Sequence, residues 1–241
     1  GGPRLVESFG EAVVAKLRAW FKLADTEELE DFNANHFVVR IGKDELIGTE
    51  DGRSVVFQHK NALELRYANR TVITGVDKKG ATTVAPLFDT WLKSKTRRDY
   101  RAVVFAPPPV IADSRDYNLW KGFAIEPAPG ECPLLLDHLQ SVICNGHEDY
   151  AQYLLKLLAF TMQYPGIPSE VATVLRGEPG TGKGIFIRAL SDIFGAHSAH
   201  LDKVDQLVGH FNALLSAKVL VFADEAFWAG DKREVGALKR L

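Results

Sequence analysis

A glycine-rich loop between an apolar run and an amphipathic stretch constrains the fold of this 241-residue chain more than any other feature. The apolar run is VATVLRG (171–177), the loop is GEPGTGKG (177–184), and IFIRALSDIFG (185–195) follows with apolar residues at helical spacing. Strand, loop and helix in this order are typical of phosphate-binding α/β folds. We therefore predict an α/β fold whose P-loop NTPase core begins at residue 169.

The loop fits the phosphate-binding frame GxxxxGK at Gly177, Gly182 and Lys183. Glycines let backbone N–H groups point inward at β- and γ-phosphate oxygens, and the N-terminus of the following helix adds partial positive charge. The Lys183 ammonium brings a full charge to the same oxygens, so we expect it to be catalytic as well as binding. The predicted nucleotide-binding residues are Gly177, Glu178, Pro179, Gly180, Thr181, Gly182, Lys183 and Gly184.

The residue after Lys183 departs from the usual frame. A Ser or Thr hydroxyl commonly stands there and ligates Mg²⁺, whereas this chain has Gly184 followed by Ile185. We therefore expect Mg²⁺ to depend on ligands from elsewhere in the chain.

A second element, KVLVFADEAFW (218–228), supplies two carboxylates. Its apolar residues are typical of a buried parallel strand, and Asp224 and Glu225 follow directly. We predict that Asp224 reaches the Mg²⁺ shell and that Glu225 orients or deprotonates the attacking water. The alternative is that Asp224 only caps a following helix. The pair favours hydrolysis over binding alone.

Three consecutive prolines, Pro107 to Pro109, form the clearest break in the chain. We place a small α+β domain at 1–112, a helical linker or collar at 113–168, and the P-loop core at 169–241. The expected strands are 36–42, 54–58, 70–76 and 101–107, and the expected helices are 5–23, from Thr26, 60–67, 86–94, 133–145 and 148–163.

Net charge limits how the chain could meet nucleic acid. With 29 basic and 31 acidic side chains the formal net charge is −2, which excludes a uniformly basic coat but leaves room for local patches. Two groups of basic residues are candidates, and a solvated face explains each equally well. They are Lys93, Lys95, Arg97, Arg98 and Arg101, and Lys232, Arg233, Lys239 and Arg240.

Other features point to a cytoplasmic protein without a membrane partner. No stretch approaches the ~18 uninterrupted apolar residues of a membrane span. Cys132 and Cys144 give no disulfide framework, and together with His138 and His147 they match no compact zinc spacing. Because the sequence opens at Gly1 without an initiator Met and ends within a helical pattern, we expect an internal fragment.

Four motifs together resemble the helicase portion of phage and prophage primase-helicase (primase-polymerase) proteins, in superfamily 3. They are YNLWKGFAIEP, CPLLLDHLQSVICNG, GEPGTGKG and VLVFADEAFWAGDKREVGALKRL. The resemblance is specific over 117–241 and looser over 30–107. It implies an AAA+-like core, incomplete in this chain, that uses ATP and Mg²⁺. It further implies a homo-oligomeric ring, usually a hexamer, that moves along single-stranded DNA in the bacterial host cytoplasm.

The resemblance also assigns roles to individual residues. Gly180, Gly182, Lys183 and Gly184 match the family's nucleotide loop, which commonly has Gly after the Lys. Asp224 and Glu225 match its Mg²⁺ and water-activating pair, while Lys232, Arg233 and Lys239 become candidates for phosphate contact or a subunit interface. The family's sensor asparagine and arginine finger lie beyond Leu241, so we expect weak turnover by residues 1–241 alone.

Two other functions remain open at this stage. The loop pattern GxPGxGKG also occurs in nucleoside monophosphate kinases, although the Asp224–Glu225 pair suits water activation better than transfer to a metabolite. The chain could instead bind ATP without hydrolysing it, as a scaffold or a decayed prophage remnant.

Overall fold

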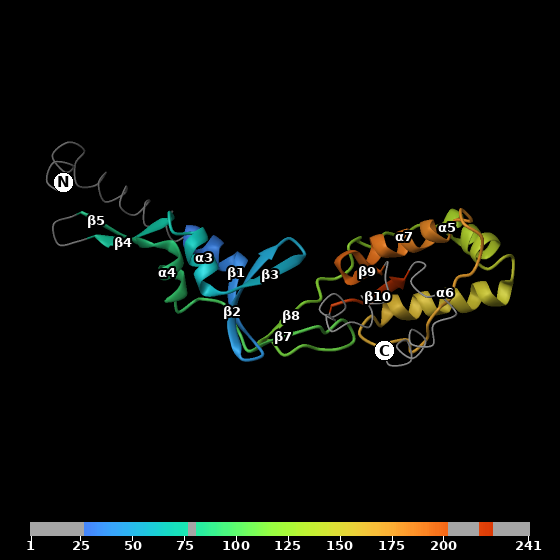
Figure 1. The fold of residues 1–241 in the computed structure, drawn as a ribbon, viewed down its shortest axis with the longest axis horizontal. Coiled ribbons are helices and arrows are strands. Elements are labelled where there is room, and N and C mark those ends of the chain that lie inside the picture. The colour runs from blue at the N-terminus through green and yellow to red at the C-terminus, as the bar shows by residue number, and fades with distance from the viewer. Residues whose placement is uncertain (1–26, 77–80, 202–216, 224–241) are drawn as a thin grey trace, which may run out of the picture. The chain divides into compact units, whose positions relative to one another are not determined.

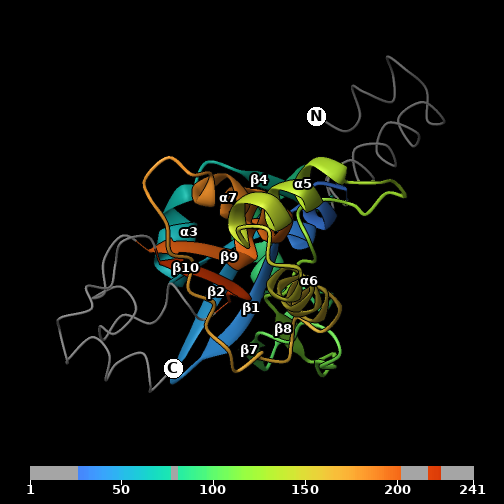
Figure 2. The same ribbon diagram turned by 90° about the vertical axis from the view of Figure 1, so that its right-hand side faces the viewer.

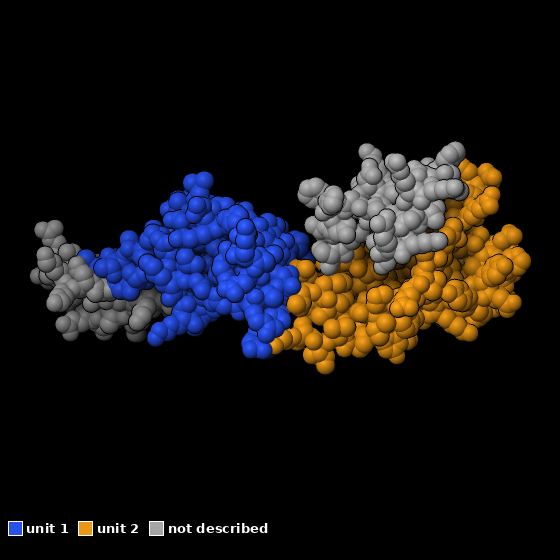
Figure 3. All heavy atoms as spheres, turned by 60° about the horizontal axis from the view of Figure 1, so that its bottom comes forward, with its two compact units in different colours: residues 1–103, 114–117 blue, residues 104–113, 118–241 orange. Residues whose placement is uncertain are grey.

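A computed structural model describes residues 27–76, 81–201 and 217–223. The chain forms two compact units (Figure 3). Unit 1 contains residues 1–103 and 114–117, and unit 2 contains residues 104–113 and 118–241. Each unit is described separately below.

Unit 1 is built on a four-stranded sheet in the order β3-β2-β1-β6 (Figure 1). Its strands are β1 (His36–Ile41), β2 (Asp44–Asp51), β3 (Ser54–Gln58) and β6 (Asp99–Tyr100). The first three form an antiparallel meander, and β6 joins β1 in parallel. In β1, Phe37 and Val39 are fully buried, which explains why this run folds as a central strand.

Helices and a hairpin complete unit 1. Residues 27–35 are helical, and α3 (Lys60–Arg66), the antiparallel hairpin of β4 (Thr71–Val76) and β5 (Thr82–Pro86), and α4 (Leu87–Leu92) follow the meander. Their apolar side chains share one core. Its buried members are Phe32, Ile47, Leu63, Val72, Leu87, Phe88 and Trp91.

The strands β7 (Ala102–Val104) and β8 (Asp116–Asn118) pair with each other, and most of their residues belong to unit 1. Unit 2 contains helices and a parallel strand pair. Its elements are α5 (Pro133–Asp137), the π-helical η1 (His138–Ile143), α6 (Glu148–Gln163), α7 (Lys183–Phe194), the 3-10 turn η2 (Gly195–His197), β9 (Ser198–Leu201) and β10 (Leu220–Ala223). Figure 2 shows β9 and β10 side by side. A buried cluster of Leu139, Cys144, Ala151, Leu154, Phe186 and Leu190 joins η1, α6 and α7.

The segment 118–124 packs against the turn η2, which joins α7 to β9. His197 is 3% exposed, and its Nε2 accepts the amide of Lys121 at 3.0 Å while its Nδ1 donates to the Ala217 carbonyl at 3.0 Å. Trp120 stacks on the His197 ring, with centroids 4.6 Å apart. His197 is therefore structural, because both of its ring nitrogens are satisfied inside the protein.

Several predicted elements are confirmed. The long helix has the expected bounds of 148–163, and strands occupy most of 36–42, 54–58 and 70–76. The predicted helix at 133–145 is present as α5 continuing into the π-helical η1.

The strand predicted at 171–177 is wrong. These residues form no strand, and Val174 is 86% exposed. A strand needs hydrogen-bonding neighbours, and in the part of the chain that the structure describes β9 and β10 pair only with each other. The strand predicted at 101–107 is also too long, since β7 ends at Val104.

Candidate nucleotide-binding loop

The loop 177–184 enters α7 at an end whose position is fixed by core packing. Phe186, Leu190 and Phe194 are each at most 3% exposed and form one stripe of α7. Phe186 and Leu190 pack against buried residues of η1 and α6. Side chains that repeat at this spacing bury one face of a helix, so the first turn of α7 is held at a defined place on unit 2.

The backbone of the loop requires glycine at two points. Gly180 has a φ of 79° and Gly182 a φ of 91°, a left-handed region that residues with a Cβ rarely adopt. Gly182 directly precedes α7, and its carbonyl accepts the amides of Ile185 at 3.2 Å and Phe186 at 3.3 Å. The second left-handed residue therefore turns the chain into the helix.

The amide groups of the loop are available to a ligand. From Gly180 to Gly184 no backbone amide donates a hydrogen bond to any residue that the structure describes. A Cβ placed on Gly180 or Gly184 would meet no atom within 4 Å, so the space beside them is open. Free amides at a helix N-terminus carry partial positive charge, and this geometry favours an anion such as phosphate.

The Lys183 ammonium lies against the oxygen atoms of the same loop. Its Nζ is 2.8 Å from the Gly177 carbonyl, 2.8 Å from the Glu178 carbonyl and 3.1 Å from the Thr181 hydroxyl. The Thr181 hydroxyl in turn donates to the Glu178 carbonyl at 2.9 Å. Since all three partners of the ammonium are uncharged, an anionic phosphate oxygen would be a stronger acceptor. The loop and its lysine fit a nucleotide phosphate chain.

The predicted carboxylates Asp224 and Glu225 lie outside the described residues, as do the basic residues after 231. The strand before Asp224 is described as far as Ala223. In the 93–101 group, three arginines form ion pairs inside unit 1: Arg97 with Asp99, Arg98 with Glu50 and Arg101 with Asp116. Three of the five basic side chains of this group are therefore paired with carboxylates of the same unit.

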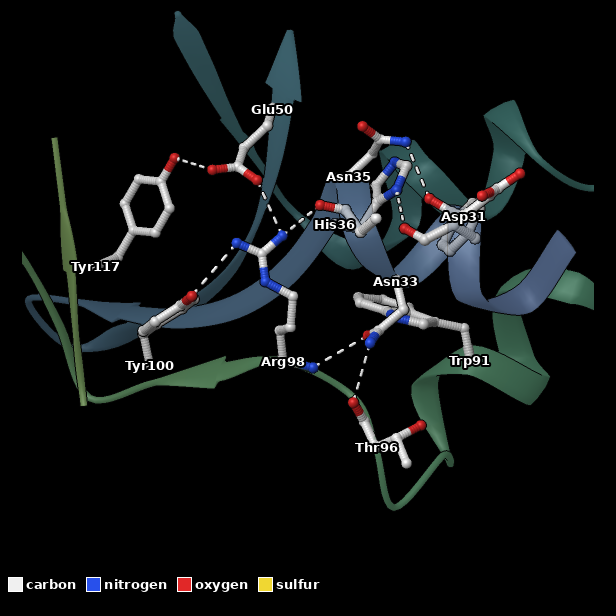
Figure 4. A network of polar contacts seen from close by, with 12 residues as sticks. Asp31, Asn33, Asn35, His36, Glu50, Trp91, Thr96, Arg98, Tyr100 and Tyr117 are labelled. Atoms are coloured by element: carbon white, nitrogen blue, oxygen red, sulfur yellow. Dashed lines mark hydrogen bonds and ion pairs between the residues drawn. The ribbon is translucent and has the colours of Figure 1, made fainter. Parts of the chain in front are cut away.

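Arg98 is the centre of a polar network in unit 1 (Figure 4). Its guanidinium donates to Glu50 Oε2 at 2.9 Å, to the Tyr100 hydroxyl at 3.3 Å and to the Ala34 carbonyl. The Tyr117 hydroxyl donates to Glu50 Oε1 at 2.6 Å. Burial, and next the hydrogen bond to Glu50, raise the pKa of Tyr117 far above its usual value, so it stays a neutral donor.

One contact of the loop was not expected from the sequence. His138 Nε2 lies 3.1 Å from the Gly182 carbonyl oxygen. In the sequence this histidine stands out only as a poor candidate for zinc, and no group of three metal-ligating side chains occurs among the described residues. No spacing rule links positions 138 and 182, because the contact depends on how η1 packs on α7.

Membrane association was also not expected, and none of the helices within the described ranges is long and apolar enough to cross a membrane.

Comparison with known proteins identifies a shared fold. Residues 175–241 match a family of unknown function, DUF5906. A search of curated proteins found no match.

Solved structures of the NrS-1 C terminal region are similar over most of the chain. The apo structure of its residues 305–718 has a TM-score of 0.59 at 19% identity and covers 88% of this chain and 47% of that one. Its A form apo structure has a TM-score of 0.62 at 18% identity and covers 92% and 49%. The chain thus spans about half the length of these structures, and it shares their mixed α/β fold.

Proposed function

We propose that this chain is part of an ATP-dependent DNA helicase of the superfamily 3 type, from a phage or prophage primase-helicase. It binds ATP and Mg²⁺ at the loop 177–184 and hydrolyses ATP to move along single-stranded DNA, as a homo-oligomeric ring in the bacterial host cytoplasm. The observation that carries the proposal is the loop itself: its amides at the start of α7 donate to no described residue, and its Lys183 ammonium has only neutral partners.

The proposed chemistry gives each residue one task. The loop amides and Lys183 hold the β- and γ-phosphates, and Glu225 orients or deprotonates the attacking water. Asp224 holds Mg²⁺, which supplies charge neutralisation at the phosphates. Gly184 offers no hydroxyl for the metal, so this scheme depends on Asp224 more than a loop with Ser or Thr would.

The course of the chain supports the placement of Asp224. After α7 the short turn η2 leads directly into β9, and both β9 and β10 contact α7. β10 is parallel to β9, and Leu220 packs against the core cluster that contains Phe186 and Leu190. Ligands bind at the carboxyl ends of parallel strands in open α/β sheets, so Asp224, which follows β10 in the sequence, is the residue we assign to the metal.

A comparison of nucleotide binding by the parent chain and by the Lys183→Ala variant tests the proposal. We expect the purified chain to bind ATP and ADP, and AMP much more weakly, because the loop recognises the terminal phosphates. Lys183→Ala should weaken ATP binding by about 100-fold or more, since it removes a charge-assisted contact from a site built around it. Lys156→Ala, which removes an exposed lysine of α6, is the matched control and should bind as the parent does. Isothermal titration calorimetry measures the dissociation constants of the parent and of the two variants.

The longer protein allows a test of the activity itself. There Lys183→Ala should abolish DNA-stimulated ATP hydrolysis and unwinding together. Equal binding of ATP by the parent and by Lys183→Ala would disprove the proposed site. Transfer of phosphate to a nucleoside monophosphate, independent of DNA, would instead identify a kinase.

A further inference from the structure

His138 belongs to a part of unit 2 that is distant in sequence from the loop. It is the first residue of the π-helical η1, and the next residue, Leu139, is 1% exposed in the core cluster that also contains Phe186. Packing of Leu139 therefore fixes the backbone beside His138 relative to the first turns of α7. π-helical turns are rare and occur frequently at functional sites.

The imidazole of His138 touches Gly182 in two ways. Its Nε2 is 3.1 Å from the Gly182 carbonyl oxygen, and because a carbonyl can only accept, the histidine nitrogen is the donor. A Cβ placed on Gly182 would lie 2.6 Å from His138 Cε1, so the ring packs directly against the α-carbon. The absence of a side chain at Gly182 makes room for the histidine.

We propose that His138 is a positioning residue of the nucleotide site, which acts by orienting the peptide unit between Gly182 and Lys183. The Gly182 carbonyl and the Lys183 amide belong to this one planar unit, and in a trans peptide they point in opposite directions. A hydrogen bond that holds the carbonyl toward His138 therefore turns the Lys183 amide away from it. That amide is among those with no partner in the described chain.

The inference rests on the proposed function, because it assigns the Lys183 amide to a phosphate oxygen. His138 does not touch the nucleotide in this account. It fixes the direction of one donor before binding, and a donor that is already oriented binds more tightly than one that must be ordered on contact. The inference also links the motif CPLLLDHLQSVICNG to the loop GEPGTGKG, which the sequence presents as separate features.

A matched pair of substitutions tests this role. His138→Gln keeps an N–H donor at a similar distance from the backbone, whereas His138→Met has a similar length and no donor. We expect His138→Met to weaken ATP binding about tenfold and His138→Gln to stay within about threefold of the parent, the range that one hydrogen bond covers. Titration of the whole chain gives the dissociation constants, and thermal unfolding without nucleotide shows that each variant is folded.

The outcomes separate the inference from the proposed function. If the parent binds ATP and Lys183→Ala does not, but His138→Met binds as the parent does, the inference is wrong and the proposed function stands. The inference is equally wrong if His138→Gln is as weak as His138→Met, since the donor would then not matter. If the parent itself fails to bind, the proposed function is wrong and the inference with it. Should His138→Met not fold, His138→Leu replaces it.

Discussion

Gly182 is the most constrained residue of the loop, because both its φ of 91° and its contact with His138 exclude a side chain. We expect Gly182→Ala to weaken ATP binding by at least tenfold. A left-handed residue with a Cβ costs about 1–2 kcal/mol, and the new methyl group would displace the imidazole as well. A fluorescent ATP analogue measures the affinity.

Gly130→Ala is the control for this substitution, because Gly130 lies outside the loop. A Cβ at Gly130 meets no atom within 4 Å, and its φ is not in the left-handed region. We expect this variant to keep the parent's affinity. Equal losses in both variants would contradict the explanation from the backbone of Gly182.

At the residue scale the sequence predicted where the loop enters α7 but not the histidine that contacts the loop. Gly182 and Lys183 follow from a frame of fixed spacing, since the loop is a continuous segment whose chemistry depends on order along the chain. His138 could not be found in this way, because its contact with Gly182 arises from packing between helices. Whether the loop residues bind nucleotide stays a prediction.

Asn33 joins three elements of unit 1, and its loss should destabilise that unit. Its Oδ1 accepts from Trp91 Nε1 at 2.9 Å and from the Arg98 amide at 3.1 Å, while its Nδ2 donates to the Thr96 carbonyl at 3.0 Å (Figure 4). We expect Asn33→Ala to lower the free energy of unfolding by about 2–3 kcal/mol, because three partners lose their hydrogen bonds.

Denaturant unfolding followed by tryptophan fluorescence checks this value. Asn35→Ala is the matched control, since Asn35 is exposed and its Nδ2 makes one local bond, to the Asp31 carbonyl at 2.9 Å. Its effect should stay below about 0.5 kcal/mol. A loss at Asn33 no larger than that at Asn35 would mean that the three contacts do not stabilise the unit.

The start of β1 should make unit 1 sensitive to acid. His36 is 3% exposed, and burial, assisted by Arg66 and Arg70, lowers its pKa against the opposing hydrogen bond with the Phe32 carbonyl. A lowered pKa in the folded state means that protonation favours unfolding. The stabilisation is therefore complete above about pH 6.5 and is lost as pH falls through the folded-state pKa.

We expect the free energy of unfolding of unit 1 to fall between pH 7 and pH 5, by at most about 1.4 kcal/mol per pH unit from this one group. His36→Gln should flatten that dependence even though it lowers stability at pH 7. Parallel curves for the parent and His36→Gln would contradict the assignment.

Helices and strands could be predicted where apolar residues repeat at a regular spacing and therefore form one buried face. The helix 148–163 satisfies this condition, and its bounds agree with the structure. The strand β2 (DELIGTED) was missed because its acidic residues hide the pattern, and its pairing with β1 is set by partners along the sheet. The segment 171–177 has the composition of a strand, but a strand also needs neighbours, which sequence composition does not supply.

At the scale of the whole molecule, the two units have separate buried cores among the described residues. We expect ATP to stabilise unit 2 and leave unit 1 unchanged. At a concentration 100 times the dissociation constant the gain would be about 2.7 kcal/mol. Hydrogen exchange of the intact chain, with and without ATP, resolves the two units by peptide.

Protection should increase in peptides that cover 183–194 and 138–143 and stay constant in those that cover β1 and β2. Lys183→Ala should remove the increase. Equal protection of both units on addition of ATP would show that they are energetically coupled and that separate cores do not imply separate responses.

The position of the Lys183 ammonium has a consequence for how fast and how tightly the loop can capture its ligand. Because carbonyl oxygens of the loop hold this side chain, most of its rotamer freedom, roughly 2 kcal/mol for a lysine, is lost when the protein folds rather than when a ligand arrives. An incoming phosphate then only exchanges neutral oxygens for charged ones. The carbonyl oxygens of the loop thus hold the Lys183 ammonium before binding, in the way that phosphate oxygens would hold it in the complex.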